Sequence, residues 1–248
     1  MGYWPIVLNV LKNSDVIVLI ADARVPEMTR NREIIRKATI MNKKVVLVFN
    51  KIDLVCDEEI ALLKKKYPES FFVTNKNKKS VTKLRDYLEE LAEKNSRVSL
   101  RVGIVGYPNV GKSTIINMII PEAKLKVSNI SGTTKKTEWI RFGRLRFMDS
   151  PGVIPVEDSA DVVGIVSAKD PNKMKNPEKV ADKIIGFLNN KNRKILENFY
   201  GAKADNNYDF MREIGKKKKF LLRGGEIDER RTAIKIIEDW QNGKISLR

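Results

Sequence analysis

The sequence predicts an α/β fold, in which a doubly wound, mostly parallel six-stranded sheet is followed by a small all-α domain. Three observations predict it. Short runs of valine, isoleucine and leucine alternate with amphipathic segments from residue 15 to residue 149. Such apolar runs are typical of parallel strands covered on both faces, and strand–helix alternation is typical of a doubly wound sheet. After Pro155 the apolar runs end and only helical patterns follow.

Six strands are expected in the first part of the chain. They are short apolar runs bounded by polar residues, at residues 15–22, 44–50, 70–75, 100–106, 137–142 and 144–149. Amphipathic patterns predict helices between them, at residues 31–40, from Asp57 onward, at 80–95 and at 112–120. A tight turn at Gly143 makes the last two strands antiparallel. With strands numbered along the chain, the expected spatial order is 3-2-1-4-6-5.

The second part of the chain predicts a separate helical domain. Its helical patterns cover residues 176–190, 193–201, 209–218 and 228–243. Asp228 is suited to cap the last of these helices. We therefore expect a domain at 1–160 that holds the sheet and a helical domain at 161–248. Trp139 and Trp240 are expected in the hydrophobic core.

Composition excludes several kinds of chemistry and favours one kind of partner. The chain carries a formal net charge of +17, which favours a polyanionic partner, most often nucleic acid. The alternative is a solvated surface rich in lysine and glutamate, as in heat-stable proteins. The single cysteine, Cys56, excludes an internal disulfide and a cysteine-cluster metal site. The absence of histidine excludes histidine-based acid–base, nucleophilic and zinc chemistry.

The hydropathy pattern predicts the cellular location of the protein. No apolar run approaches the roughly 20 residues that span a bilayer. The N-terminus also lacks the basic-then-apolar pattern of a signal peptide. We therefore expect a cytoplasmic protein with no membrane partner. We also expect a monomer and no specificity for DNA.

A glycine-rich phosphate loop stands between a predicted strand and a predicted helix. Residues 103–114 read GIVGYPNVGKST and contain the spacing Gly106-x-x-x-x-Gly111-Lys112-Ser113, in the setting that this motif requires. Glycines let backbone N–H groups turn toward a phosphate, and the helix N-terminus adds positive potential. Lys112 would reach the β- and γ-phosphates, and the Ser113 hydroxyl would bind Mg²⁺. The nucleotide-binding residues expected here are Asn109, Val110, Gly111, Lys112, Ser113 and Thr114.

A phosphate loop does not identify the base, but the tetrapeptide Asn50-Lys51-Ile52-Asp53 after a buried strand does. The Asp53 carboxylate can accept hydrogen bonds from the N1–H and the exocyclic amine of guanine. Adenine lacks that donor pair and would leave a buried carboxylate unpaired. Lys51 can lie along the base plane, and Asn50 can brace neighbouring loops. The sequence therefore predicts binding of GTP and GDP.

Two further segments are expected near the phosphates. Residues 148–152 read MDSPG, where Asp149 can hold Mg²⁺ through a water and the Gly152 N–H can bond the γ-phosphate. Residues 131–137 read SGTTKKT, where Thr134, or second in preference Thr133, would supply another Mg²⁺ ligand. The alternative for this segment is an ordinary loop rich in serine and threonine. The expected catalytic residues are Lys112, Thr134 and Gly152, and the expected Mg²⁺ ligands are Ser113, Thr134 and Asp149.

The order of these motifs is a cyclic permutation of the usual GTPase order. Asn-Lys-x-Asp and then Thr74-Asn75-Lys76 precede the phosphate loop, and Asp-x-x-Gly follows it. Together with DARVP at 22–26 and LLRGGEID at 221–228, this order resembles the YlqF/YawG family of circularly permuted GTPases. The resemblance implies a circularly permuted P-loop GTPase fold. It also implies that Thr74, Asn75 and Lys76 form the loop that touches guanine O6.

The resemblance further implies a role in assembly of the large ribosomal subunit, through binding to ribosomal RNA. We expect hydrolysis of GTP to GDP and phosphate at a slow basal rate, because Val153 stands where many GTPases have a water-orienting glutamine. Asn109 matches the asparagine that binds K⁺ in potassium-activated GTPases, so K⁺, the ribosome or both are the expected activators. Alternatively, Asn109 only stabilises its loop. Four lysines could contact RNA or form a solvated helix end: Lys216, Lys217, Lys218 and Lys219.

Two other functions compete with that of a ribosome assembly GTPase. One is a GTP-sensing RNA-binding scaffold with negligible turnover, and the other is a signalling GTPase that acts on a protein effector. A signalling GTPase predicts no salt-dependent RNA binding, whereas the other two predict a steep dependence on salt. Arg24 also allows two interpretations, as a switch-like residue near the nucleotide or as a structural ion pair.

Overall fold

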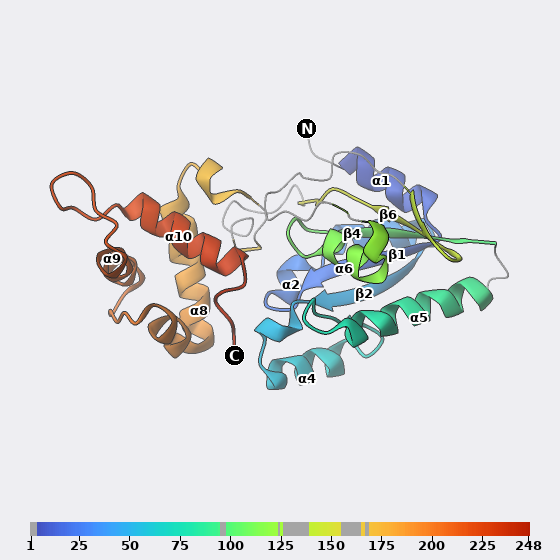
Figure 1. Ribbon diagram of the computed structural model, residues 1–248, viewed down its shortest axis with the longest axis horizontal. Coiled ribbons are helices and arrows are strands. Elements are labelled where there is room, and N and C mark those ends of the chain that lie inside the picture. Colours follow the sequence, from blue (N-terminus) through green and yellow to red (C-terminus); the bar gives the residue numbers. More distant parts are fainter. Residues whose placement is uncertain (1–3, 95–97, 124, 126–138, 155–164, 167–168) are drawn as a thin grey trace. The chain divides into compact units, whose positions relative to one another are not determined.

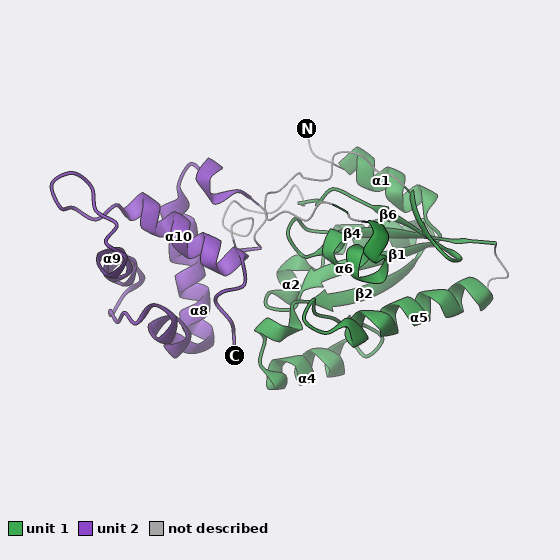
Figure 2. Cartoon of the chain, viewed as in Figure 1, with its two compact units in different colours: residues 1–157 green, residues 158–248 purple. Residues whose placement is uncertain are grey.

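The computed structural model describes residues 4–94, 98–123, 125, 139–154, 165–166 and 169–248 (Figure 1). The chain forms two compact units, residues 1–157 and residues 158–248 (Figure 2). The first, unit 1, contains the sheet, and the second, unit 2, is helical.

Unit 1 is built on a six-stranded sheet with the order β3-β2-β1-β4-β6-β5, which confirms the predicted order. All neighbouring strands are parallel except β5 and β6. The strands are β1 Val16–Asp22, β2 Lys44–Asn50, β3 Phe71–Phe72, β4 Leu100–Gly106, β5 Trp139–Phe142 and β6 Leu145–Asp149. Every residue of β1 is buried, as expected for an inner strand with helices on both faces. The doubly wound fold class is therefore confirmed.

The described helices of unit 1 cover both faces of the sheet. They are α1 Trp4–Asn13, α2 Pro26–Thr29, α3 Arg32–Ile40, α4 Asp57–Lys66, α5 Lys78–Lys94 and α6 Lys112–Ile119. On one face, α1 and α3 bury Val10 and Ile34 against Ile17 and Leu19 of β1. On the other, α5 and α6 contact each other and β6. This packing leaves the carboxyl ends of the parallel strands for the loops that carry the motifs.

Unit 2 is a helical bundle with its own core. Its main helices are α8 Pro177–Tyr200, α9 Asn207–Lys218 and α10 Glu229–Gln241. Trp240 is fully buried, and its indole N–H donates to the backbone oxygen of Ile165 at 2.8 Å. Asp228 caps α10 by accepting a hydrogen bond from the backbone N–H of Arg231 at 2.9 Å, as predicted. The sheet fold followed by an all-α unit is thus the predicted architecture.

Several local expectations differ from the structure. Trp139 is 39% exposed rather than buried, because among the described residues it lies on the edge strand of the sheet, β5. The expected strand at 70–75 is reduced to β3, and the next residue, Val73, pairs its N–H with Phe49 as the chain leaves the sheet. The two helices expected at 176–190 and 193–201 form one element, α8, which has non-helical backbone angles at Asn192.

Within the parts of the chain that the structure describes, none of the helices combines the length and the apolarity that a membrane crossing demands.

Candidate functional site

The phosphate loop connects β4 to α6 and depends on two glycines. Gly106 ends β4 with φ of 150°, and Gly111 caps α6 with φ of 100°. A Cβ at Gly106 would lie 2.4 Å from the backbone oxygen of Ile20, and one at Gly111 would lie 2.2 Å from Nδ2 of Asn50. Side chains larger than hydrogen are therefore excluded by backbone conformation and by space. The loop is held tightly against β1 and the end of β2.

Lys112 begins α6 and is buried within the phosphate loop. Its Nζ donates to the backbone oxygen of Tyr107 at 2.7 Å and lies 3.4 Å from that of Gly106. Burial lowers the pKa of Lys112 to about 8, and the nearby Asp149 carboxylate offsets part of this effect. A second negative charge beside the amine would favour its charged form. The amine is thus suited to receive an anion.

Ser113 and Asp149 meet although they come from different elements. The Ser113 hydroxyl donates to Oδ2 of Asp149 at 2.6 Å. Asp149 ends β6 and stands opposite Ile104 of the neighbouring strand β4, so the sheet register brings the carboxylate to the start of α6. Hydroxyl and carboxylate oxygens are hard ligands of the type that Mg²⁺ prefers. Thr114 follows on α6 and is partly exposed.

The Asn-Lys-x-Asp segment meets the phosphate loop directly. Nδ2 of Asn50, at the end of β2, donates to the backbone oxygen of Val110 at 2.8 Å. Both residues are buried. Asn50 precedes Val110 by 60 residues, so the sheet topology produces this contact. The expectation that Asn50 braces a neighbouring loop therefore has a structural counterpart.

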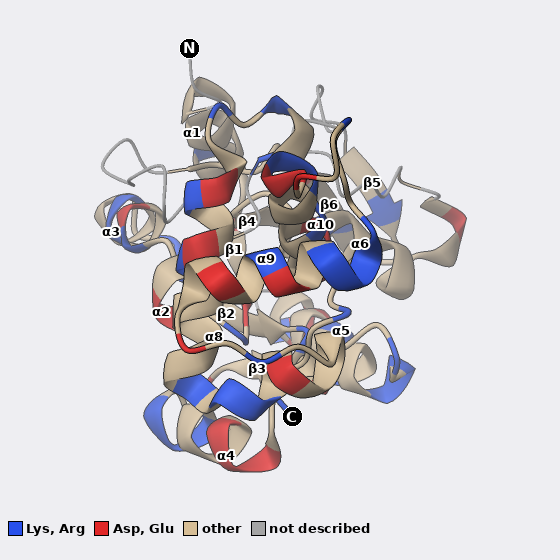
Figure 3. Cartoon of the chain, turned by 90° about the vertical axis from the view of Figure 1, so that its left-hand side faces the viewer, with Lys and Arg blue, Asp and Glu red and all other residues tan. Residues whose placement is uncertain are grey.

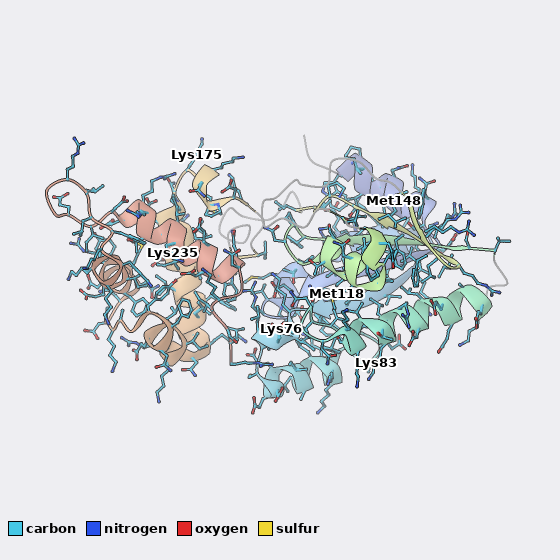
Figure 4. All side chains as sticks on the ribbon, viewed as in Figure 1. Lys76, Lys83, Met118, Met148, Lys175 and Lys235 are labelled. Carbon is cyan, nitrogen blue, oxygen red and sulfur yellow. The ribbon has the colours of Figure 1, made fainter. Side chains whose placement is uncertain are left out.

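Asp53 meets the Thr74-Asn75-Lys76 segment. Oδ1 of Asp53 accepts a hydrogen bond from Oγ1 of Thr74 at 2.7 Å. Oδ2 of Asp53 forms an ion pair with Nζ of Lys76 at 2.9 Å. Burial alone would raise the pKa of Asp53, but the contacts with Thr74 and Lys76 lower it. Asn75 is exposed between them. Lys76, labelled in Figure 4, extends from this turn, and its side-chain contact with Asp53 was not foreseen from the sequence.

Lys51 joins a buried charge cluster that sequence reasoning did not assign to the site. Its Nζ lies 2.8 Å from Oδ2 of Asp22, and Arg24 binds both oxygens of the same carboxylate. Burial alone would raise the pKa of Asp22, but the two cations hold it well below its usual range. Arg24 therefore forms a structural ion pair, which was one of its two interpretations. The DARVP segment drew attention to Arg24, but no local sequence pattern indicated that Arg24 and Lys51 contact the same carboxylate.

The segment after β6 lies against the phosphate loop. A Cβ at Gly152 would come within 2.4 Å of the backbone nitrogen of Pro108. The next residue, Val153, is 2% exposed and donates its N–H to the backbone oxygen of Gly106 at 3.1 Å. Its side chain packs in the core that α1 and α3 share with the sheet. Asn109, in the loop itself, has φ of 60°.

The remaining predicted residues do not belong to the part of the site described above. Thr133 and Thr134 fall outside the described residues. Four predicted RNA-contacting lysines belong to unit 2: three end α9, the fourth caps it, and all four are exposed. Figure 3 shows the basic residues gathered at one end of α9. They are Lys216, Lys217, Lys218 and Lys219.

Comparison with protein-family models gives two matches. The model described as RsgA GTPase matches residues 6–157, and the model described as 50S ribosome-binding GTPase matches residues 101–220. The first covers unit 1 through all six strands. The second begins in β4 and extends through the phosphate loop into unit 2.

Two curated relatives are similar over nearly the whole chain. A GTP-binding protein of Methanocaldococcus jannaschii is 37% identical over 244 residues, which is 97% of this chain and 65% of that protein. Nuclear/nucleolar GTPase 2 of Arabidopsis thaliana is 33% identical over 252 residues, which is 98% of this chain and 43% of the plant protein. The chain thus spans less than two thirds of the length of these relatives.

Among solved structures, GNP-bound YlqF from T. maritima matches with a TM-score of 0.67 at 20% sequence identity. The match covers 98% of this chain and 95% of the YlqF chain. A GDP-bound structure of the same protein matches with a TM-score of 0.66. These likenesses show a common fold that extends over both units.

Proposed function

This chain belongs to the RsgA GTPase family with the circularly permuted fold of YlqF, and on that basis we propose that it hydrolyses GTP as a ribosome assembly factor. The observation that carries the proposal is the hydrogen bond of 2.8 Å from Nδ2 of Asn50 to the backbone oxygen of Val110. It joins a guanine motif to a phosphate loop that follows it in the chain. A site for a whole guanine nucleotide requires both at one edge of the sheet.

The phosphate loop would hold the β- and γ-phosphates. Backbone N–H groups between Gly106 and Gly111 can point toward phosphate oxygens, because neither glycine carries a side chain that would obstruct them. Lys112 contributes a buried amine whose pKa of about 8 would rise beside the added negative charge. The N-terminus of α6 adds positive potential at the same place.

The oxygen ligands fit a resident Mg²⁺ ion. Ser113 Oγ and Asp149 Oδ2 lie 2.6 Å apart, and we propose that Ser113 binds the metal directly and Asp149 through a water. Thr134 is proposed as a further ligand. When bound, Mg²⁺ neutralises charge on the phosphate oxygens. Among the described residues no group of three or more acidic, histidine or cysteine side chains could hold a metal ion, so the proposed ligands are hydroxyls, nucleotide oxygens and, through a water, the Asp149 carboxylate.

Asp53 would identify the base. A carboxylate has about four lone-pair positions, so Asp53 can keep its contacts with Thr74 and Lys76 and still accept two hydrogen bonds from guanine. Its lowered pKa keeps the acceptor ionised. The backbone of Thr74, Asn75 and Lys76 is proposed to contact guanine O6. Lys51 would lie along the base plane.

Hydrolysis would be slow without an activator. Val153 is buried and apolar, so it cannot orient a water molecule. We propose that K⁺ near Asn109, a ribosomal surface or both supply the missing group. The Gly152 N–H would contact the γ-phosphate, and this contact would be lost after hydrolysis. Equal hydrolysis rates in KCl and NaCl, with large subunits both present and absent, would exclude the role of K⁺.

Unit 2 would bind ribosomal RNA. Residues 161–248 carry a net charge of +7, and the exposed lysines Lys216–Lys219 lie within this unit. RNA phosphates neutralised by such lysines release counterions, which makes affinity depend on salt. Because the Asp-x-x-Gly segment leads along the chain into unit 2, loss of the γ-phosphate is proposed to change RNA affinity.

Co-sedimentation with purified small and large ribosomal subunits tests this proposal. It should be run with a GTP analogue, with GDP and without nucleotide. We expect binding to large subunits that depends on nucleotide and weakens steeply with salt. Subunit binding without multiple turnover of GTP would instead support the RNA-binding scaffold. Nucleotide binding without salt-dependent RNA binding would support a signalling GTPase.

A further inference from the structure

The end of β1 carries a carboxylate that two cations share. Asp22 is 2% exposed and accepts hydrogen bonds from Nε and Nη2 of Arg24 at 3.1 and 2.8 Å. Nζ of Lys51 lies 2.8 Å from the same oxygen that Nη2 of Arg24 contacts. The Arg24 side chain is fully buried and that of Lys51 is 17% exposed. Burying such charges is costly unless they are paired.

The backbone around Asp22 is also held at several points. Asp22 stands opposite Asn50 in the parallel register of β1 and β2. Its own N–H donates to Oγ1 of Thr29 at 2.9 Å. The N–H of the next residue, Ala23, donates to the backbone oxygen of Asn50 at 2.8 Å. The carboxylate therefore has a defined position beside the start of the Asn-Lys-x-Asp turn.

Lys51 occupies a backbone conformation that a lysine rarely adopts. Its φ is 64° and its ψ is 32°, in the left-handed region. A residue without a Cβ would adopt this conformation at lower cost. The ion pair with Asp22 is a specific interaction that holds the side chain of Lys51 in this turn.

We propose that Asp22 is a positioning residue for guanine nucleotide binding, which acts by holding Lys51 in place while Arg24 fixes Asp22. This inference rests on the guanine site proposed above and extends it to the DARVP segment. Without the carboxylate, Lys51 would lose its partner and would remain next to a second cation. Its side chain would then leave the orientation needed to lie along the base.

The chain offers a matched control at the opposite end of β1. Asp15 precedes the strand and binds the side chain of Arg101 through Nη2 to Oδ1 at 2.9 Å and Nε to Oδ2 at 3.2 Å. It is therefore also an aspartate paired with arginine in unit 1. It lies away from the carboxyl ends of the strands, so Asp15→Asn should leave nucleotide affinity unchanged.

The test is a double-mutant cycle on GDP affinity, measured by titration with a fluorescent GDP analogue. The variants of the full chain are Asp22→Asn, Lys51→Met and their combination, with Asp15→Asn as control. We expect Asp22→Asn to weaken GDP binding by about tenfold when Lys51 is present and by less than about twofold in the Lys51→Met background. Such coupling would not arise from a general loss of structure.

Four outcomes would count against the inference or its premise. Wild-type affinity in folded Asp22→Asn would overturn it, and so would equal losses in both backgrounds. If Asp22→Asn does not fold, Arg24→Lys replaces it, because this variant keeps the positive charge but cannot bind both oxygens of Asp22 as arginine does. A loss of about threefold or more would then support the inference, and no loss would overturn it. Failure of the wild type to bind GDP would overturn the proposed function as well.

Discussion

We expect replacement of Gly152 by alanine to weaken the binding of GTP while leaving the binding of GDP nearly unchanged. A Cβ at this position would lie 2.4 Å from the backbone nitrogen of Pro108 and 2.5 Å from its Cα. Both are backbone atoms, which cannot rotate away as a flexible side chain could. Ordinary contact begins at 3.4 Å, so residue 152 must move from the phosphate loop by about 1 Å.

The expected magnitude follows from that displacement. A misplacement of about 1 Å can reduce a reaction rate by about 100-fold. Loss of the proposed N–H contact with the γ-phosphate should weaken binding of a GTP analogue by about tenfold or more, since hydrogen bonds to charged groups contribute about 1.5–3 kcal/mol. GDP affinity should stay within about twofold, because GDP has no γ-phosphate. The added strain should lower the free energy of unfolding by about 1–3 kcal/mol.

The assay compares the affinities of a fluorescent GTP analogue and of GDP in wild type and in Gly152→Ala, together with single-turnover hydrolysis. Gly143→Ala is the control, because a Cβ at Gly143 has nothing within 4 Å although its φ is +53°. That substitution costs backbone strain alone and should leave the affinity ratio unchanged. A folded Gly152→Ala variant with the wild-type ratio of GTP-analogue to GDP affinity would refute the reasoning.

Three further predictions concern separate parts of the chain. The lowered pKa of Lys112, about 8 against an ordinary 10.5, means that its protonated form opposes folding at neutral pH and ceases to do so as pH rises. In urea unfolding without nucleotide, the free energy of unfolding of the wild type should therefore rise by up to about 3 kcal/mol relative to that of Lys112→Met between pH 7 and 10.5. A difference between the two proteins that stays constant over this pH range would contradict the prediction. Ser113→Ala should bind GDP equally in Mg²⁺ and in EDTA, whereas wild type should bind more tightly in Mg²⁺; the same enhancement in both proteins would exclude Ser113 as a ligand. Substitution of Lys216–Lys219 by glutamine should reduce the salt dependence of RNA binding, with GDP affinity as the unaffected control, and an unchanged salt slope would place the RNA contacts elsewhere.

Residue patterns were sufficient for most of the fold and for the central motifs of the site. Apolar runs ending in polar motif residues located the strands at 44–50 and 100–106, and the motif order predicted the arrangement β3-β2-β1-β4-β6-β5 that the structure has. The helix α1 was not foreseen, although Val7, Val10 and Leu11 have the spacing of one buried helical face. Trp139 was assigned to the core from its residue type, but an edge strand leaves it exposed.

The sequence by itself determined the phosphate loop and the guanine motif, because these depend on short fixed spacings, and it determined the strand order through the order of the motifs along the chain. Only the tertiary structure decided which charged and polar side chains share a partner. Asp22 pairs with Arg24 from its own loop and with Lys51 from the turn after β2. Asp53 pairs with Thr74 and Lys76 from the segment after β3. A charge can pair with any opposite charge that the fold brings within reach, so its partner depends on which loops meet at the carboxyl edge of the sheet.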